Sequence, residues 1–443
     1  MPYYSYYLPV TLLPILLAGL YFFFEKELSS PRPRWFWWIG SLTLIALVGY
    51  DVIQEHALYD YFKGYFHGGR KVVRNIDVLY DDACYGFTNF PLFAYLFVPL
   101  ANLPKELSGR VFFLVGYLLL LPLACWLVKT SEVKGWRRFL VLALLALNGP
   151  LDYSIWLGNT TQIVMLFVLL AFFTLNRGWD WLTGILLGVG GLIKLPLVLP
   201  SGYFLLRGKW KVVGGGLLVA GAVLFLSLVL IPLEINSTWL ERCVLMMAGN
   251  PTAAYNNQSL NGFLARIFMP GNYGWDPLTP TPAYIAASNI GRILLALPAL
   301  YILIAGRKTE KTAQHHAIEF FIILVFSLLT SPIAWTHYFA LLLIPAAMIL
   351  GNPERLNYRN WMRLLLAPSL ILLSVPKDLS LALFEWTGST LMLSPQFIGS
   401  LLFYGLLITV WALSHNAARA AKGEPRDTGN VYNYGTTGGS VEA

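Results

Sequence analysis

Charged residues are scarce in this sequence. Only 12% of the 443 residues are Asp, Glu, Lys or Arg, whereas a soluble protein carries roughly 25%. A soluble domain needs charge over its outer surface, and 57% of this chain is apolar. The composition therefore excludes a water-soluble enzyme, a disordered chain and a fibrous repeat. It predicts an all-α polytopic integral membrane protein.

Cysteine is also scarce. The three cysteines, Cys84, Cys125 and Cys243, are too few and too scattered for a disulfide framework or a metal cluster. The net charge of +8 would suggest nucleic-acid binding in a soluble protein. In a membrane protein, basic loops facing anionic cytoplasmic headgroups explain it better. We therefore expect the lipid bilayer as a partner, and no nucleic acid.

The amino terminus lacks the positive region of a signal peptide, so we expect the run Leu8–Phe24 to be a retained membrane helix. A bilayer core needs about 20 apolar residues per helix. The apolar runs predict about 11–13 spans, because the run 181–206 is interrupted at Gly190-Gly191 and at Lys194-Leu195-Pro196. The expected spans are 7–24, 35–53, 111–128, 138–151, 161–175, 181–206, 212–232, 287–306, 317–332, 338–351, 362–376 and 396–414.

The basic residues predict the orientation of the spans. With a cytoplasmic carboxyl terminus, one side holds 20 of the 31 Lys and Arg residues and the other holds nine, as the positive-inside rule requires. The long loops 54–110 and 233–286 then lie outside the cytoplasm. We expect one transmembrane domain over residues 1–415 and a disordered cytoplasmic tail over 416–443, which is rich in Gly and polar residues.

Several chemically capable residues gather on the outer side of this topology. Asp60 follows the second span and is either the N-cap of an interfacial helix or a catalytic carboxylate. Asp51, Glu55 and the pair Asp81-Asp82 are alternative acidic groups. Lys194 lies inside an apolar run, where it snorkels, pairs, or meets an anion such as a lipid phosphate.

Three outer segments are rich in polar groups. Asn256–Gly262 offers amides and hydroxyls to sugar hydroxyls or a phosphate, with Arg266 as a charge partner. Trp156–Gln162 opens a helix whose N-terminus could hold an anion. The third segment, Ser331–His337, joins two spans. Its His337 is either a structural histidine or a group for proton transfer.

The order of the short motifs resembles glycosyltransferase family 87 over roughly residues 35–350. These motifs are Asp60-Tyr61-Phe62 with Tyr65, Phe90–Phe93 with Pro99-Leu100, Gly158-Asn159, Gly191–Pro196, Asn257–Leu260 and Ser331–His337. The chain departs from the family at Gly158-Asn159, where Gly-Gln is common, and at Asn89-Phe90-Pro91, where Tyr-Pro-Pro is common.

The resemblance implies a GT-C type helix bundle with long outer loops, an active site on the outer face of the cell membrane, and a polyprenyl-phosphate sugar donor. It implies Asp60 as the general base and His337 as a supporting group. The expected substrate-binding residues are Lys194, Asn257, Gln258, Ser259, Arg266, Asn159, Gln162, Tyr61 and Trp335.

The expected reaction is transfer of a hexose, with mannose the first candidate, to a lipid or glycan acceptor with inversion. A carboxylate that accepts the acceptor's hydroxyl proton contributes roughly 10²–10⁴-fold, and the departing lipid phosphate needs positive charge. We expect no metal and no cofactor, because the leaving group is a monophosphate. The alternatives are an arabinofuranosyltransferase with the same donor class, and a transporter or flippase of lipid-linked sugars, for which paired broken helices are expected.

Overall fold

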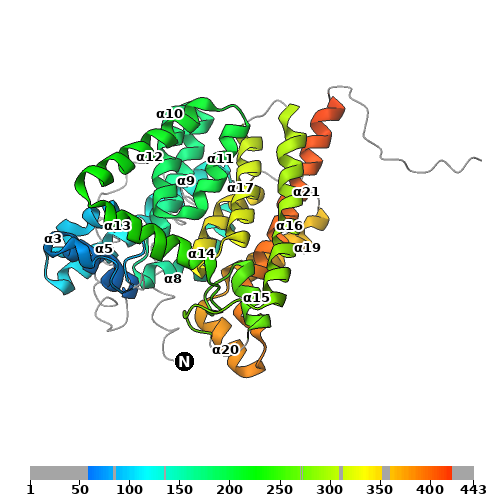
Figure 1. Cartoon of the computed structure of the whole chain (residues 1–443). Coiled ribbons are helices and arrows are strands. Elements are labelled where there is room, and N and C mark those ends of the chain that lie inside the picture. Colours follow the sequence, from blue (N-terminus) through cyan, green and yellow to red (C-terminus); the bar gives the residue numbers. More distant parts are fainter. Residues whose placement is uncertain are drawn as a thin grey trace, which may run out of the picture.

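The computed structural model describes residues 58–82, 86–133, 136–269, 271, 273–308, 313–351 and 360–421. The expected spans 7–24 and 35–53, the alternatives Asp51 and Glu55, and the predicted tail beyond Ala421 lie outside the described residues. Within the described residues all the regular structure is helical, apart from one isolated antiparallel bridge between Asn257 and Trp335. This agrees with the expected all-α class (Figure 1).

The elements before the break at Lys194 are η1 (Tyr61–Phe66), α3 (His67–Arg74), η2 (Ile76–Val78), η3 (Pro91–Phe97), α4 (Val98–Ala101), α5 (Lys105–Leu118), α6 (Leu120–Ser131), α7 (Trp136–Ala146), α8 (Gly149–Leu157), α9 (Thr161–Asn176) and α10 (Asp180–Ile193). Those between Lys194 and the gap after Lys308 are η4 (Leu195–Leu197), α11 (Val198–Leu206), α12 (Trp210–Leu230), α13 (Leu233–Thr238), η5 (Trp239–Leu245), α14 (Met246–Gly249), α15 (Leu260–Phe268), α16 (Pro282–Ala305) and η6 (Gly306–Lys308). The remainder are α17 (Ala313–Thr330), η7 (Thr336–Leu342), α18 (Leu343–Gly351), η8 (Asn360–Met362), α19 (Arg363–Ser374), α20 (Lys377–Thr387), η9 (Thr390–Leu393) and α21 (Pro395–Ala421).

Fewer helices than expected are long enough to cross a bilayer. Among the described residues four are both long and apolar enough, namely Lys105–Ser131, α12, α16 and Pro395–Asn416. The count becomes six if the bent pairs α7–α8 and α19–α20 each form one span. The other expected segments fold as apolar helices of 10–17 residues. The structure is thus that of a multi-pass membrane protein, with several helices too short to span alone.

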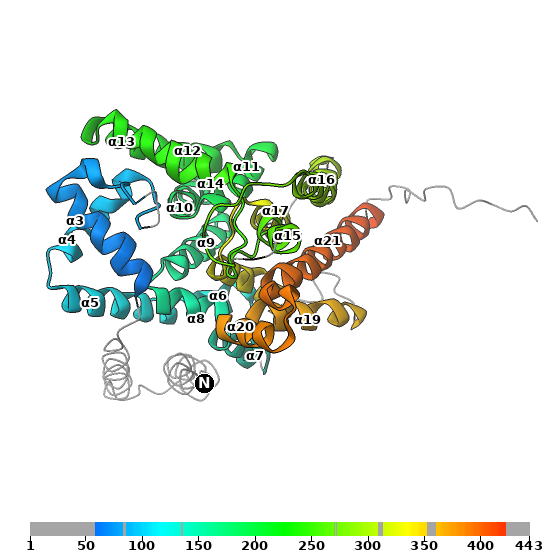
Figure 2. The same ribbon diagram turned by 60° about the horizontal axis from the view of Figure 1, so that its bottom comes forward.

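Helix α17 lies inside the bundle. It packs against α9, α11, α16 and α21, which surround it in both views (Figures 1 and 2). Its buried Phe320 and Phe321 contact Phe172 of α9, with ring centroids 5.1 Å and 5.0 Å away. Helix α12 packs on α10, and its exposed residues include Leu217, Phe225 and Val229. Such an outward apolar face suits contact with lipid.

The expected interruption at Lys194-Leu195-Pro196 is confirmed, whereas the one expected at Gly190-Gly191 is not, because α10 continues through both glycines. Helix α10 ends at Ile193, Lys194 has an extended backbone (φ −132°, ψ 97°), and the chain resumes as η4 and α11. Pro196 has no N–H to donate to the Leu192 carbonyl, so α10 cannot continue through it. It lies instead in the first turn of η4, where a missing N–H costs no helical hydrogen bond. The hydroxyl of Ser327 on α17 donates to the carbonyl of Pro196 at 2.8 Å. The break therefore places Lys194 between two half-helices that α17 holds in position.

Candidate active site

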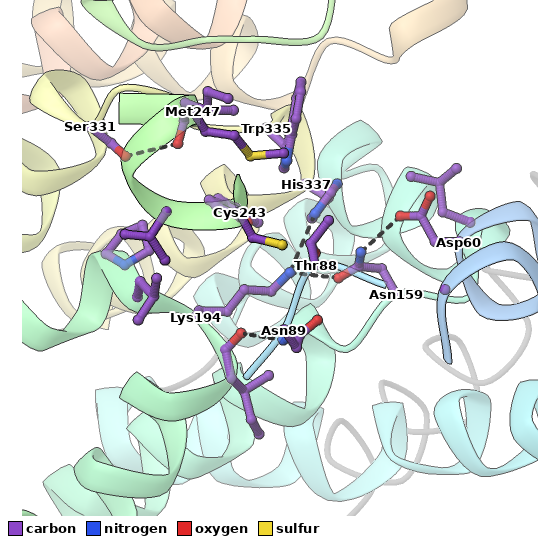
Figure 3. Close-up of a pocket in the computed structure, with 18 of the residues that line it drawn as sticks. Asp60, Thr88, Asn89, Asn159, Lys194, Cys243, Met247, Ser331, Trp335 and His337 are labelled. Atoms are coloured by element: carbon purple, nitrogen blue, oxygen red, sulfur yellow. Dashed lines mark hydrogen bonds between the residues drawn. The ribbon is translucent and has the colours of Figure 1, made fainter. Parts of the chain in front are cut away.

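A cavity of about 1390 Å³ is lined by residues that lie far apart in the sequence. Asp60, Asn159, Lys194, Trp335 and His337 all line it, and four of them come from different segments (Figure 3). The loops 54–110 and 233–286, which the charge pattern placed on one side, both contribute to its wall. The structure therefore brings five of the expected site residues to one cavity.

Asp60 lies at the start of η1 and makes no side-chain cap to that helix. Its Oδ2 instead accepts a hydrogen bond from Asn159 Nδ2 at 2.9 Å. Burial raises the pKa of the Asp60 carboxyl above its ordinary value, although the Asn159 hydrogen bond and the charges of Lys194 and Lys63 act in the opposite direction. Asp60 thus bonds Asn159 in the cavity and does not cap η1, and a carboxyl with a raised pKa in a cavity is typical of functional sites.

Gly158 makes the contact between Asp60 and Asn159 possible. It ends α8 with φ +68°, a conformation that favours glycine. A Cβ at this position would lie 2.7 Å from Cβ of Tyr61 and 2.9 Å from Cδ2 of Leu58. The main-chain N–H of Leu58 also donates to the carbonyl of Trp156 at 2.7 Å. The lack of a side chain thus lets the segment that carries Asp60 close onto the end of α8.

Lys194 and Asn159 continue the polar contacts beyond Asp60. The buried Lys194 Nζ donates to Asn159 Oδ1 at 2.7 Å and to His337 Nε2 at 3.4 Å, and it lies 4.3 Å from the centroid of the Tyr338 ring. Asn159 Oδ1 also accepts from the main-chain N–H of Thr160 at 2.8 Å. The amide of Asn159 therefore orients a carboxylate with one end and an ammonium with the other (Figure 3).

His337 lies at the far end of this set of contacts, 3% exposed. Because its Nε2 faces the Lys194 ammonium, it acts there as an acceptor, and the proton belongs on Nδ1. Nδ1 is buried, with no hydrogen-bond partner among the described residues. A buried N–H without a partner costs free energy, so the orientation of this ring is held by its contact with Lys194 and by the packing around it.

Three neighbouring residues, Asn257, Gln258 and Ser259, form a cluster behind the wall of the cavity, which we call the amide cluster. Asn257, Gln258 and Ser259 are buried and do not line the cavity. Asn257 Oδ1 accepts from the Ala334 N–H at 3.1 Å, and Gln258 N–H donates to the Ala334 carbonyl at 2.7 Å. These bonds hold the segment that carries Trp335 and His337, so the three residues act on the site through that segment.

Arg266 also lies away from the cavity. It is 1% exposed, and Nη1 donates to the carbonyls of Ala254 and Asn257 at 2.7 Å and 2.9 Å. Nη2 donates to Ser394 Oγ at 2.9 Å. The sequence suggested contact with a donor phosphate, whereas here the guanidinium joins the amide cluster to the segment before α21. We therefore propose a structural role for Arg266.

We expect Arg266→Met to lower the stability of the purified protein by about 2–4 kcal/mol, because buried carbonyls lose a charged donor. The fall should appear as a lower thermal midpoint in detergent. Arg242→Met is the matched control, since Arg242 is exposed and does not line the cavity. A variant of Arg266 with unchanged stability and weakened donor binding would restore the role that the sequence suggested.

Tyr61 and Gln162 are placed behind the cavity. The Tyr61 hydroxyl bonds to Ser108 Oγ at 2.5 Å, and its ring stacks on Phe112 at 4.2 Å. Gln162 Oε1 accepts from Ser154 Oγ at 3.0 Å. Neither residue lines the cavity, and neither do the alternative acids Asp81 and Asp82.

Other lining residues were not among the expected site residues. Thr88 and Asn89 lie near Lys194 in Figure 3, and Asn89 Nδ2 donates to the Ile193 carbonyl at 3.3 Å. Tyr153, Trp275 and Lys377 line the cavity as well. Aromatic and basic residues are common throughout the outer loops, so composition alone did not separate these from their neighbours.

Comparison with known proteins supports the resemblance noted in the sequence. A model of glycosyltransferase family 87 matches residues 87–332, more than half of the chain. A polyprenol-phosphate-mannose-dependent alpha-(1-2)-phosphatidylinositol pentamannoside mannosyltransferase of Mycolicibacterium smegmatis is 27% identical over 308 residues, which are 67% of this chain and 68% of that protein. The protein of the same name from Mycobacterium tuberculosis is 26% identical over 228 residues, 51% of this chain and 48% of that protein.

Proposed function

The chain belongs to glycosyltransferase family 87, and we propose that it transfers mannose from a polyprenyl-phosphate donor to a glycolipid on the outer face of the cell membrane. The observation that carries the proposal is the set of contacts Asp60–Asn159–Lys194–His337 in one cavity. The donor class and the phosphatidylinositol-based acceptor are those in the names of the two relatives. The 20-to-nine distribution of basic residues supports the orientation.

In the proposed reaction Asp60 accepts the proton of an acceptor hydroxyl as that oxygen attacks the anomeric carbon. The bond from the anomeric carbon to the donor phosphate oxygen breaks, and the lipid phosphate leaves with the electron pair. The ammonium of Lys194 is suited to stabilise that charge, and His337 supports it through the contact between its Nε2 and Lys194 Nζ. Attack opposite to the leaving group inverts the sugar, so a β-linked donor gives an α-glycoside.

The apolar part of the cavity suits the polyprenyl chain of the donor. Leu199 of α11, Val223 and Leu224 of α12 and Met247 of α14 line it. These groups lie on the same cavity as Lys194, and the outer face of α12 is exposed apolar surface. A lipid tail in this part leaves its phosphate near the break between α10 and α11, where a cation is available.

The direct test is transfer of radiolabelled sugar by the purified protein in lipid. We expect label from polyprenyl-phosphate mannose to appear in a phosphatidylinositol mannoside acceptor, with release of polyprenyl phosphate. Transfer from polyprenyl-phosphate arabinofuranose, and not from polyprenyl-phosphate mannose, would mean that the donor sugar is arabinofuranose. Counterflow of lipid-linked sugar without transfer would favour a transporter.

The raised pKa of Asp60 predicts a pH dependence. Only the carboxylate accepts a proton, so kcat/KM should fall as the pH drops through a pKa above the ordinary range of an aspartate. Lys63→Met removes a charge that lowers this pKa, so the acid limb should move to higher pH. The shift should be roughly a few tenths of a pH unit, because Lys63 is partly exposed and screened. An acid limb that stays fixed in this variant, or is absent from the wild type, contradicts the assignment.

A further inference from the structure

The cavity has a second group of polar and aromatic residues that the proposed donor contacts do not use. Tyr153 and Trp156 of α8 stack with their ring centroids 6.1 Å apart. Tyr255 packs edge to face on Trp275, with ring centroids 5.6 Å apart. Asn256 joins the pairs, since its Oδ1 accepts from Trp275 Nε1 at 3.0 Å and its Nδ2 donates to Tyr153 Oη at 3.3 Å. All five line the cavity. We refer to them below as the aromatic wall.

A lysine lies over one part of the aromatic wall. Lys377, the first residue of α20, has its Nζ 4.9 Å from the Trp156 ring centroid and 5.2 Å from that of Tyr153. Helix α20 turns 95° from α19, and Pro376 packs so closely on α8 that a Cβ at Gly149 would lie 2.5 Å from its Cα. This tight contact fixes the start of α20, and so the ammonium, above the rings.

Lys377 also has an acidic neighbour. Its Nζ lies 3.3 Å from Asp378 Oδ1, but that carboxylate is 57% exposed, while the Lys377 side chain is 20% exposed. Lys377 lines the cavity and Asp378 does not. An ammonium has three donors, so the pair with an exposed carboxylate leaves Lys377 able to bind an anion on the cavity side.

The aromatic wall adjoins the catalytic groups. The ring centroid of Tyr153 lies 6.2 Å from that of His337. The carbonyl of Trp156 accepts a hydrogen bond from the N–H of Leu58, which is two residues before Asp60. A molecule lying on the rings would therefore be beside His337 and the segment that carries Asp60. The polyprenyl tail is a poor occupant, because hydrocarbon would take the cavity side of the Lys377 ammonium out of water and offer it no anion in exchange.

We propose that the aromatic wall binds the sugar rings of the acceptor and that Lys377 binds the phosphate of its lipid headgroup. A sugar ring has an apolar face that packs on aromatic side chains and hydroxyls that bond to amides. The proposal rests on the proposed function and deepens it, since it makes the acceptor an anionic glycolipid and gives donor and acceptor separate lysines, Lys194 and Lys377.

The test compares two acceptors, a phosphatidylinositol mannoside and the neutral octyl α-mannoside. Lys377→Met should raise the KM of the phosphatidylinositol mannoside about 3- to 10-fold, because a partly exposed charge contact is lost. The same variant should leave the KM of octyl α-mannoside and the KM of the donor unchanged. Lys377→Arg, which keeps the positive charge, should retain most of the affinity for the phosphatidylinositol mannoside. Trp275→Ala should raise the KM of both acceptors about 3- to 10-fold.

The matched controls lie off the cavity. Lys209→Met removes a lysine that pairs with Asp180 at 3.6 Å, and Trp386→Ala removes a tryptophan of α20 that is 83% exposed. Both should leave all three KM values unchanged. An unchanged KM for phosphatidylinositol mannoside in Lys377→Met, or an effect on the donor alone, overturns the assignment of Lys377. Unchanged KM values for both acceptors in Trp275→Ala overturn the proposal that the aromatic wall binds the acceptor's sugar rings.

Failure of the proposed function is distinguishable from failure of this inference. If the wild-type protein releases no polyprenyl phosphate, the function is wrong. Binding of fluorescent phosphatidylinositol mannoside, measured by polarisation, then decides the inference with the same variants. Weaker binding in Lys377→Met and Trp275→Ala, beside unchanged thermal midpoints, supports it, and equal binding in all variants overturns it.

Discussion

Replacing Asp60 with Asn is expected to lower turnover by at least ~10²-fold, or about 2.7 kcal/mol in the barrier. The amide has the shape of the carboxylate, and its oxygen can still accept from Asn159 Nδ2, which now bonds Asp60 Oδ2 at 2.9 Å. What is lost is the capacity to take a proton. The positions of Asn159 and Lys194 should therefore survive, and the loss should appear in kcat.

Binding measurements separate base catalysis from a role in donor recognition. The Asp60→Asn variant should bind labelled polyprenyl-phosphate mannose as the wild type does, because the carboxylate is assigned to the acceptor hydroxyl. Asp82→Asn is the matched control, since Asp82 lies off the cavity and within 4.0 Å of Lys71. Near-normal turnover in Asp60→Asn together with loss in Asp82→Asn would move the base to the second acidic segment.

The break at Lys194 was predictable from the sequence because its causes are local. Pro196 lacks the N–H that a continuing helix needs, and this holds whatever packs around it. The two glycines did not interrupt α10, which runs through Gly190 and Gly191 to Ile193. The length of the other helices was less predictable, since hydropathy records an apolar run and not where the backbone bends. The apolar run 362–376, for example, contains α19 (Arg363–Ser374), and the chain then turns 95° into α20.

The pairing of Asp60 with Asn159 could not be predicted from spacing. The two residues are 99 positions apart, and their contact depends on the left-handed backbone at Gly158 and on the segment that packs against it. Composition likewise could not distinguish lining residues from supporting ones. Asn256 and Asn257 are neighbours in a polar run, yet Asn256 lines the cavity while Asn257 holds the Ala334 N–H behind it.

The second large effect is expected for Lys194→Met. This change should weaken binding of polyprenyl-phosphate mannose by about 10- to 100-fold, because a buried charge-assisted contact with phosphate is worth roughly 1.5–3 kcal/mol. The fold should survive, since Met fills similar volume with an apolar chain and Asn159 Oδ1 keeps its bond from the Thr160 N–H. A thermal midpoint close to that of the wild type would verify this.

Turnover should fall as well in Lys194→Met, even at saturating donor, because the same ammonium orients Asn159 and faces His337. The informative comparison is with Lys377→Met, which changes another of the lysines that line the cavity. Loss of donor affinity should belong to Lys194, and loss of affinity for the anionic acceptor should belong to Lys377. Donor binding by Lys194→Met equal to that of the wild type would mean that the lysine serves only to hold Asn159 and His337. The phosphate contact would then have to be sought at another cation of the cavity wall, such as Lys63 or Lys105.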